Sequence, residues 1–294
     1  MGEFFNIDAS KYDKTKHYIV TKPSSLNNPK DNSVMFITEA FINNWEQLLK
    51  VKNCIVLWPK NIEIPNEILV RHAVILCDDP RKGQALLYQE NNVTCNAKPC
   101  EYQSINGAFI AKGAKIGENT IVFPGAYIDS QVTIGNDCYI GSGVKLIGHI
   151  DIGNNVIIRE NTVIGSDGLT RMRDDNGRIV TIPQFGGVVI EDDVQIGALT
   201  VIAKGAIDNT IIRTGCRIDN CCFISHNVQL GENSAVVGES ILFGSVSTED
   251  GVFISGNSSI RDGVHIGKKA FIGMSSNVVD DVKAFSKIMG NPAK

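Results

Sequence analysis

Positive charge and long apolar runs are scarce in this sequence of 294 residues. The formal net charge is −4, which argues against the basic face that non-specific binding to nucleic acid or to a membrane surface requires. No run approaches the ~18 apolar residues of a membrane span, and the initial segment MGEFFNIDASKYDK has no apolar core of signal-peptide length. We therefore expect a cytoplasmic protein with no membrane span and no nucleic-acid partner.

Metal-binding motifs are absent as well. None of the eight cysteines forms a CxxC pair, and no histidine lies at zinc-finger spacing from them. Free thiols in a reducing compartment are the simplest account of this pattern. We predict no metal site, and we expect Cys221 and Cys222 to be buried packing residues rather than a reactive pair.

From about residue 105 onward, an aliphatic residue recurs at every sixth position. The spacing holds over residues 110–164, returns over 190–202, and continues in a new register over 212–278, where Thr248 is the one exception. Glycine often follows directly, as in Ile116-Gly117. A strict period of six matches neither an ordinary helix nor an alternating strand. It is typical of hexapeptide β-helices.

This period predicts a specific architecture. Each hexapeptide is expected to form one short strand and one tight corner, and three of them close a triangular coil with the aliphatic side chains inside. Coils stack at the parallel-strand spacing of ~4.8 Å. In known hexapeptide folds the coil is left-handed, against the usual rule for parallel crossovers. We predict a left-handed parallel β-helix over residues 104–284, followed by a C-terminal tail over residues 285–294.

Two stretches interrupt the period. The first, residues 165–188, is polar and turn-rich, and we expect it to form a loop that extends from the helix and carries substrate-binding arginines at Arg171, Arg173 and Arg178. A solvated hairpin without function is the alternative. The second interruption is the segment KGAIDNTIIRTG, which begins at Lys204.

Residues 1–103 lack the sixfold period and predict a small α/β domain. Strand-like segments occupy residues 33–37, 54–58 and 73–77, and a helix-like segment follows the first of them. Asp79-Pro80 is a suitable start for a last helix. No GxGxxG and no GxxxxGK[ST] occurs in this domain, so it is neither a dinucleotide fold of the usual kind nor a P-loop.

His226 is the histidine whose position suggests chemistry. It lies two residues after the inward Ile224, at a predicted corner, and Gly244 follows 18 residues later, one coil further on. Stacking would place the Gly244 backbone one strand spacing from His226, where its N–H is suited to bind an oxyanion beside a base. Asp219, seven residues before His226, is a candidate for orienting the imidazole. An unremarkable surface histidine is the alternative.

A resemblance to a known family covers the helix from about residue 105 to 280. The segments IPQFGGV and ISHNV are its most specific parts. With them, the helix resembles the UDP-3-O-acylglucosamine N-acyltransferases of lipid A synthesis, and the likeness extends weakly over the N-terminal domain. The resemblance implies that His226 is a general base, Asp219 its partner and Gly244 the oxyanion donor. It also implies that the N-terminal domain binds the nucleobase, with Phe36 or Phe41 stacking on it.

The sequence departs from that family at three places. The family's nucleobase motif, F-x-x-N-x-x-Y, is not matched after Phe36, and Phe41 is one place out of register. Asp262-Gly263 stands where the family has a second Gly-His. The ending MGNPAK is more typical of nucleotide-sugar N-acetyltransferases of the same superfamily. These differences favour a relative that acylates a nucleotide-linked amino sugar for surface glycan or lipopolysaccharide synthesis, with the lipid A reaction as the alternative.

By this resemblance, the acyl donor is a thioester, either acyl-CoA or an acyl carrier protein, and no cofactor is bound tightly. A homotrimer is expected, because closed symmetry is the norm for oligomers and three prisms pack cyclically in the family. A γ-type carbonic anhydrase shares the helix but needs three zinc-binding histidines, and the nearest pair here is His226 and His265. A non-catalytic scaffold and an enzyme whose substrate amine arrives already neutral remain as alternatives.

Overall fold

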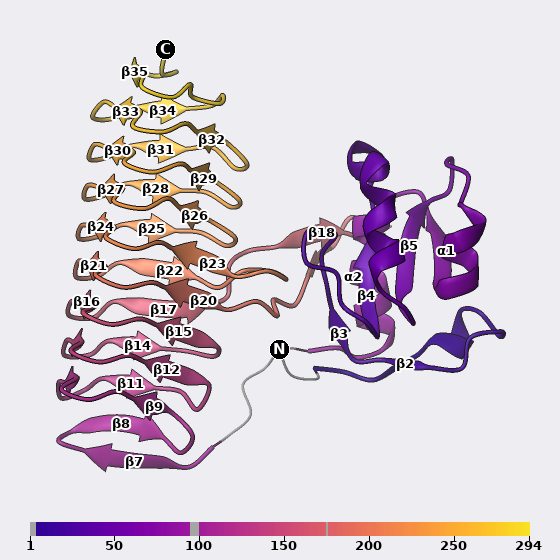
Figure 1. The fold of residues 1–294 in the computed structure, drawn as a ribbon, viewed down its shortest axis with the longest axis horizontal. Coiled ribbons are helices and arrows are strands. Elements are labelled where there is room, and N and C mark those ends of the chain that lie inside the picture. Colours follow the sequence, from indigo (N-terminus) through magenta and orange to yellow (C-terminus); the bar gives the residue numbers. More distant parts are fainter. Residues whose placement is uncertain (1–3, 95–99, 175) are drawn as a thin grey trace. The chain divides into compact units, whose positions relative to one another are not determined.

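The structure, a computed structural model, describes residues 4–94, 100–174 and 176–294. The chain forms two compact units. The first comprises Met1–Asn96 and Leu169–Phe185, and the second comprises Ala97–Gly168 and Gly186–Lys294. The segment that we expected to be a loop of the helix domain therefore belongs, over Leu169–Phe185, to the N-terminal unit (Figure 1).

The second unit is a parallel β-helix whose short strands form three sheets. The first sheet contains β10 (Ile121–Val122), β13 (Tyr139–Ile140), β16 (Ile157–Ile158), β21 (Gln195–Ile196), β24 (Arg217–Ile218), β27 (Ala235–Val236), β30 (Phe253–Ile254), β33 (Phe271–Ile272) and β35 (Lys287–Ile288). The second contains β8 (Ala108–Ala111), β11 (Tyr127–Ile128), β14 (Lys145–Leu146), β17 (Val163–Ser166), β22 (Val201–Ala203), β25 (Phe223–Ile224), β28 (Ile241–Leu242), β31 (Ser259–Ile260) and β34 (Asn277–Val278), with β7 (Tyr102–Ile105) antiparallel at its end. The third contains β9 (Lys115–Ile116), β12 (Val132–Ile134), β15 (Ile150–Ile152), β20 (Val188–Ile190), β23 (Thr210–Ile212), β26 (Gln229–Leu230), β29 (Ser247–Thr248) and β32 (His265–Ile266).

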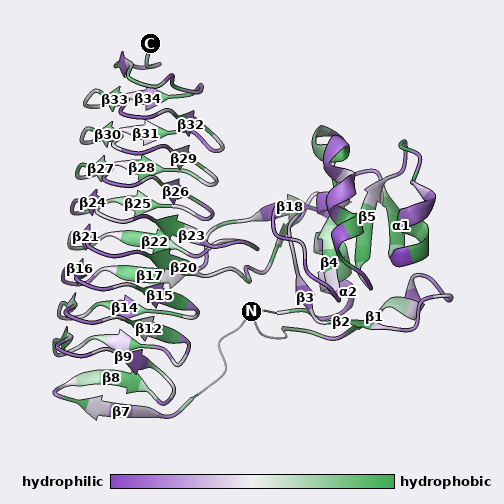
Figure 2. Ribbon diagram, viewed as in Figure 1, coloured by the Kyte–Doolittle hydropathy of each residue, from purple (hydrophilic) through white to green (hydrophobic). Residues whose placement is uncertain are grey.

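The sixfold aliphatic positions fill the interior of this helix, as predicted. From Ile128 onward they are buried side chains of one continuous core. At the open end of the helix Ile116 is 36% exposed, because β9 has a neighbouring strand on one side only. Figure 2 shows apolar strands alternating with polar corners along the helix. The period of six thus corresponds to one inward-facing side chain on each face of the prism in every coil.

Small polar residues and cysteines occupy the tight corners between the strands. Thr162 and Thr200 are fully buried and donate their hydroxyls to backbone carbonyls of the next coil. Cys138, Cys216 and Cys222 take equivalent positions, and burial raises the pKa of Cys216 and of Cys222 to about 11. Cys222 is therefore an inert packing residue, as expected. The expectation was wrong for its neighbour, because the Cys221 side chain is exposed.

Thr248, the exception to the aliphatic register, has a structural reason. Its side chain is 8% exposed, and its hydroxyl oxygen accepts a hydrogen bond from the buried Gly231 N–H at 2.9 Å. In Thr248→Val the Gly231 N–H loses its acceptor, which should lower the free energy of unfolding by about 1–3 kcal/mol. Burial of the added methyl group offsets part of this loss. Chemical denaturation measures the change, with the surface substitution Thr133→Val as control. Equal stability of the two variants would contradict the prediction.

The C-terminal segment adds to the helix rather than forming a separate tail. Within residues 285–294, strand β35 pairs in parallel with β33, so that Lys287 aligns with Phe271 and Ile288 with Ile272. Ile288 also packs against the helix core. The predicted boundary at residue 285 thus falls inside the last coil, since one more aliphatic residue is available to cover the core.

The N-terminal unit is built around a parallel sheet in the order β3 (Lys22–Pro23), β4 (Ser33–Phe36), β5 (Ile55–Pro59) and β6 (Ala73–Cys77). The three longer strands match the predicted ones. Helix α2 (Pro80–Glu90) starts where predicted, because the Asp79 side chain accepts hydrogen bonds from the N–H groups of Arg81 and Lys82. The helix-like segment after β4 is a 3-10 helix, η2 (Glu39–Lys50).

Short elements of this unit were not predicted, since they are too brief to show a period. They are β1 (Ile7–Asp8), η1 (Ala9–Lys11), β2 (Ile19–Val20), β3 (Lys22–Pro23) and α1 (Asn66–Arg71).

The inserted segment completes the core of the N-terminal unit. It forms an antiparallel hairpin of β18 (Arg171–Arg173) and β19 (Ile179–Thr181). Beyond the hairpin, the Phe185 ring is 3% exposed and packs edge-on against Phe5 and Tyr88, with ring centroids 5.7 and 5.6 Å away. Ile182 is buried in the same cluster. Ile182 and Phe185 of IPQFGGV therefore anchor the segment in this unit, and polarity alone misled the loop prediction.

Candidate functional site

Every interruption of the helix falls on one of its three edges. From β17 onward, the chain passes from the second sheet to the third at residues 167–187, 204–209, 225–228, 243–246 and 261–264. We call this the second–third edge. It includes both stretches that break the sixfold period, and it includes His226. The irregular segments of the helix thus lie along one edge of a rigid scaffold. Irregular segments on rigid scaffolds commonly carry binding and catalytic residues.

Strand register fixes which side chains stack along this edge. Ile202 pairs with Ile224, Ile224 with Leu242, and Leu242 with Ile260. The residues two positions further on are stacked in the same order. They are Lys204, His226, Gly244 and Asp262.

The His226 imidazole is half-buried and is held through its Nδ1 atom. Nδ1 lies 3.2 Å from the Asn227 side-chain oxygen. That oxygen also accepts the Ala206 N–H at 3.0 Å, while the Asn227 side-chain amide donates to the Asp208 carbonyl at 2.9 Å. When Nδ1 carries the proton and donates it to this oxygen, Nε2 keeps a lone pair, which is the state that a general base requires.

Asn227 is a site residue that the sequence reasoning missed. Its side chain is oriented by residues 206–208, which belong to the second interruption of the period. The available signal was the HN pair itself, together with a break in the repeat one coil earlier. The extra residues of that break provide the backbone groups that fix Asn227, and Asn227 in turn holds the imidazole.

Gly244 lies against the imidazole, as its spacing predicted. A β-carbon added there would lie 2.5 Å from His226 Cε1 and 2.7 Å from Nε2. The Gly244 carbonyl accepts the Gly263 N–H at 2.9 Å. Among the hydrogen bonds of the described residues, none uses the Gly244 N–H. The absence of a side chain is therefore what allows His226 to lie over this peptide.

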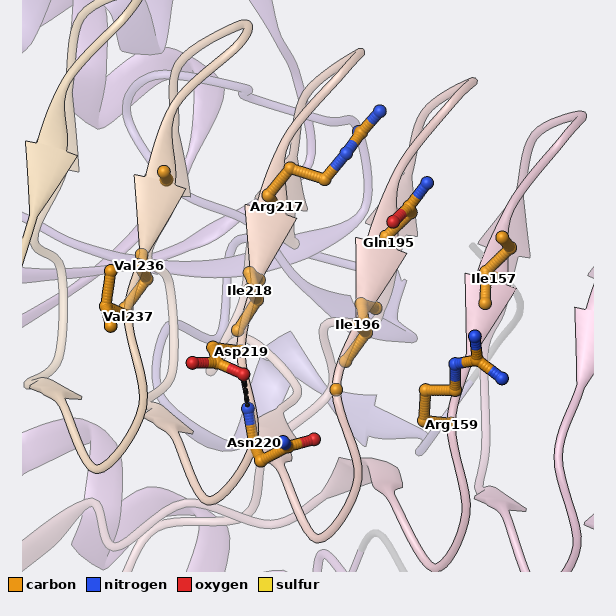
Figure 3. Close-up of a pocket in the computed structure, with 12 residues that line it drawn as sticks. Ile157, Arg159, Gln195, Ile196, Arg217, Ile218, Asp219, Asn220, Val236 and Val237 are labelled. Carbon is orange, nitrogen blue, oxygen red and sulfur yellow. Dashed lines mark hydrogen bonds between the residues drawn. The ribbon is translucent and has the colours of Figure 1, made fainter. Parts of the chain in front are cut away.

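Asp219 does not lie with His226, which corrects the predicted pair. Its carboxylate accepts the Asn220 N–H at 2.8 Å and the Gly238 N–H at 3.1 Å. It lies where the chain passes from the first sheet to the second, in a shallow groove of about 340 Å³ (Figure 3). The reason is geometric: six residues carry the chain to the next edge, so a separation of seven places two side chains on different edges.

The groove beside Asp219 is lined by charged and apolar side chains of the first sheet. Figure 3 shows Arg217 on β24 and Arg159 just after β16, the two strands that flank Gln195 of β21, with Asp219 directly after β24. The Arg217 guanidinium donates to the backbone carbonyls of Asp193 and Gly215 at 2.6 and 2.9 Å. These bonds hold Arg217 along the strand ends, and Asp219 is held by backbone amides.

An ion pair lies one coil before His226 on the second–third edge. The Lys204 ammonium is 2.6 Å from the Asp167 carboxylate, and the Lys204 side chain is only 12% exposed. Asp167 precedes the inserted hairpin, and Lys204 begins the second interruption. The pair therefore joins the two irregular segments below the imidazole.

Comparison with known proteins identifies the repeat in part of the helix. The family described as "Bacterial transferase hexapeptide (six repeats)" matches residues 113–148 and 131–166. Residues 113–166 of the helix thus match bacterial transferase hexapeptide repeats.

Two relatives show the sequence likeness. The chain is 53% identical over 79 residues to a UDP-3-O-acylglucosamine N-acyltransferase of Francisella tularensis subsp. holarctica, which is 27% of this chain and 23% of that protein. It is 40% identical over 139 residues to the enzyme of the same name from Methylobacterium nodulans, which is 47% of this chain and 39% of that protein. The chain thus spans less than half the length of the curated relatives it matches.

Solved structures show the fold. A UDP-N-acetylglucosamine acyltransferase from Bacteroides fragilis aligns with a TM-score of 0.59 at 22% identity, over 65% of this chain and 73% of that one. The corresponding protein from Arabidopsis aligns with a TM-score of 0.52 at 26% identity, over 64% and 71%. The hexapeptide repeats and these neighbours show that the second unit is a left-handed parallel β-helix, as predicted.

The predicted nucleobase residues lie at one end of the N-terminal sheet. Phe36 is the last residue of β4, and its ring packs partly buried against the core of the unit. Phe41 lies in η2 and is 59% exposed. Ligands of parallel sheets commonly bind at the carboxyl ends of the strands, where both residues are found. Phe41 is the ring that is free to stack.

The three predicted loop arginines lie on or beside the hairpin. Arg173 donates to the Gly177 carbonyl at 2.6 Å, and Arg178 forms an ion pair with Asp174 at 2.9 Å. These two side chains stabilise the turn, while Arg171 is exposed on β18. A substrate-binding role for the three arginines stays a prediction.

No three histidine, cysteine or acidic side chains among residues 4–94, 100–174 and 176–294 lie close enough to hold a metal ion. Within the same residues, no helix combines the length and the apolar character needed to cross a membrane. His265, the other histidine of the carbonic anhydrase alternative, lies in the third sheet, where its Nδ1 is 3.0 Å from the Ser247 hydroxyl.

Proposed function

We propose that this protein is an N-acyltransferase that moves an acyl group from a phosphopantetheine thioester to the amine of a nucleotide-linked amino sugar. The observation that carries the proposal is the arrangement at the second–third edge. There the His226 imidazole is held through Nδ1 by Asn227 and lies against the Gly244 backbone. The activity of the relatives, named as N-acyltransferases, supports the reaction class, and the geometry supplies a base beside an amide N–H.

The proposed chemistry needs no enzyme nucleophile. The sugar amine attacks the thioester carbonyl, and His226 takes the amine's proton as general base, a contribution of typically 10²–10⁴-fold. The Gly244 N–H stabilises the tetrahedral oxyanion. Acyl-CoA or an acyl carrier protein enters as co-substrate, so that no cofactor has to stay bound. The enzyme is expected to be cytoplasmic, because free thiols fit a reducing compartment.

Among acceptors, the names of the relatives favour UDP-3-O-acylglucosamine, the lipid A alternative. The departures at Phe36–Phe41 and at Asp262-Gly263 favour another amino sugar of surface glycan or lipopolysaccharide synthesis. A screen of UDP- and dTDP-linked amino sugars against acetyl-CoA and longer thioesters, analysed by mass spectrometry, tests both. Acyl transfer to none of them would leave the non-catalytic scaffold as the better account.

The N-terminal unit is proposed to bind the nucleobase through Phe41. Stacking of an aromatic ring on a base contributes about 1–3 kcal/mol, so Phe41→Ala should raise the KM for the nucleotide sugar by about tenfold or more while kcat is retained. Phe36→Ala should instead lower the free energy of unfolding, because its ring packs on the core. Steady-state kinetics and thermal melts separate the two effects. An unchanged KM in both folded variants would defeat the assignment.

A homotrimer is proposed as the active assembly, with the donor bound between neighbouring prisms. The support is the exposed apolar surface on the helix. Phe253 and Phe271 stack with ring centroids 5.4 Å apart on the first sheet, and Phe253 is 41% exposed. Cyclic closure would cover such a surface. Multi-angle light scattering should give three times the chain mass of 31.9 kDa, and a monomeric mass would contradict the proposal.

A further inference from the structure

Asp262 and His226 converge on the same point from opposite sides of Gly244. The position that a Gly244 β-carbon would take lies 2.7 Å from His226 Nε2 and 2.7 Å from Asp262 Oδ1. The imidazole approaches from the coil before Gly244 and the carboxylate from the coil after it. The vacant volume of the glycine is thus bordered by a base on one side and an acid on the other.

The Asp262 carboxylate has no other partner in the described part of the chain. No hydrogen bond or ion pair of residues 4–94, 100–174 and 176–294 uses it, and the guanidinium of the adjacent Arg261 lies 3.9 Å from Asp280 instead. Asp262 is exposed on the edge and so can be reached by a ligand. Its charge is therefore available to whatever group enters between it and the imidazole.

The charge of Asp262 determines which chemical group is favoured between it and the imidazole. A thioester oxyanion is disfavoured close to a carboxylate, because like charges at contact distance repel. An ammonium group is favoured there, because it can donate charge-assisted hydrogen bonds both to the carboxylate and to a neutral imidazole nitrogen. The side of Gly244 that faces Asp262 is thus suited to the acceptor amine, which has to approach His226 before it loses its proton.

We propose that Asp262 binds the ammonium group of the acceptor and presents it to His226 Nε2, which makes it a specificity-determining residue for amines over hydroxyls. The proposal rests on the function proposed above. In the reaction, Nε2 first takes one proton from the bound ammonium and releases it to solvent. The neutral amine nitrogen then forms a bond to the thioester carbon, gives a second proton to Nε2, and the carbon–sulfur bond breaks to leave an amide. The thiolate then takes the proton from the imidazolium, so the base is regenerated and a free thiol leaves.

The test compares Asp262→Asn with Asp262→Glu and with Asp280→Asn, a matched control one coil further along the same edge. Asp262→Asn should lower kcat/KM by about 10- to 100-fold near neutral pH, the usual cost of removing a charge-assisted hydrogen bond. The deficit should shrink as the pH rises and the free amine becomes neutral. Asp262→Glu should recover part of the loss, and Asp280→Asn should match the wild type.

The outcomes separate this proposal from the function on which it rests. Wild-type protein that acylates no amino sugar would overturn the proposed function. An active wild type with an equally active Asp262→Asn variant would overturn the role of Asp262 alone. A deficit that is constant across the pH range, with unchanged acceptor binding by isothermal titration calorimetry, would show that Asp262 acts on the structure of the edge and would also overturn it.

Discussion

His226→Ala should lower the rate of acyl transfer at neutral pH by about 10²–10⁴-fold, the usual share of general-base catalysis. The helix should keep its stability, because the side chain lies at an edge and contributes nothing to the aliphatic interior. Its one described side-chain hydrogen bond is to Asn227. Thermal melts and steady-state kinetics on the purified assembly measure the two quantities together.

The control for this variant is His265→Ala, which removes an exposed histidine of the third sheet. It should retain wild-type kinetics. If His226→Ala keeps more than about a tenth of the wild-type rate, the loss is under ~1.4 kcal/mol of transition-state stabilisation. The acceptor amine would then have to arrive neutral, and His226 would be a binding residue.

Asn227→Ala would separate the effect of the orientation of the His226 imidazole from the effect of its basicity, because it removes the side chain that holds the ring and leaves the ring itself in place. Asn227 fixes the imidazole through Nδ1 and is itself fixed by the backbone of residues 206–208. That dependence explains why the sequence did not reveal it: the role of Asn227 follows from a break in the repeat one coil earlier, and the path of a non-repeating segment has no period to extrapolate.

Repetition made the rest of the helix predictable. Each coil places the same steric demand on the same position, so a period of six specifies inward residues, parallel register and the stacking of Gly244 over His226. The same regularity explains the error at Asp219. Residues share an edge when they are a whole coil apart, 18 positions where the period is unbroken, and Asp219 is only seven positions from His226.

The domain boundaries could not be read in the same way. Ile182 and Phe185 lie in a stretch that is polar on average, and their apolar side chains complete the N-terminal core. Without these two side chains, part of the apolar core of the first unit would be exposed to solvent. That exposure is a property of the folded unit, so it cannot be predicted from the segment alone. The exception to the aliphatic pattern at Thr248 likewise has a cause outside the repeat, because its hydroxyl oxygen accepts the Gly231 N–H.

Gly244→Ala should be the second severe variant, with activity reduced by about 10²-fold or more and little change in stability. The added methyl group would lie 2.5 Å from His226 Cε1 and 2.7 Å from Asp262 Oδ1, whereas ordinary contact begins at 3.4 Å. Both neighbours are ends of side chains at an exposed edge, so they can move aside without disturbing the core. A displacement of roughly 1 Å of a catalytic group is enough to cost about 10²-fold.

Gly256→Ala is the matched control, because Gly256 also follows an inward aliphatic residue by two positions. The nearest atom to its added methyl group is the Gly238 carbonyl oxygen at 3.2 Å, with no catalytic side chain in contact. This variant should keep wild-type kinetics and a similar melting temperature. Were Gly244→Ala to behave in the same way, the imidazole could not be working from its place over Gly244, and the oxyanion and amine positions proposed around that peptide would both have to be moved. A Gly244→Ala variant that fails to fold would instead show that the glycine is required by the coil itself, which the side-chain nature of its neighbours argues against.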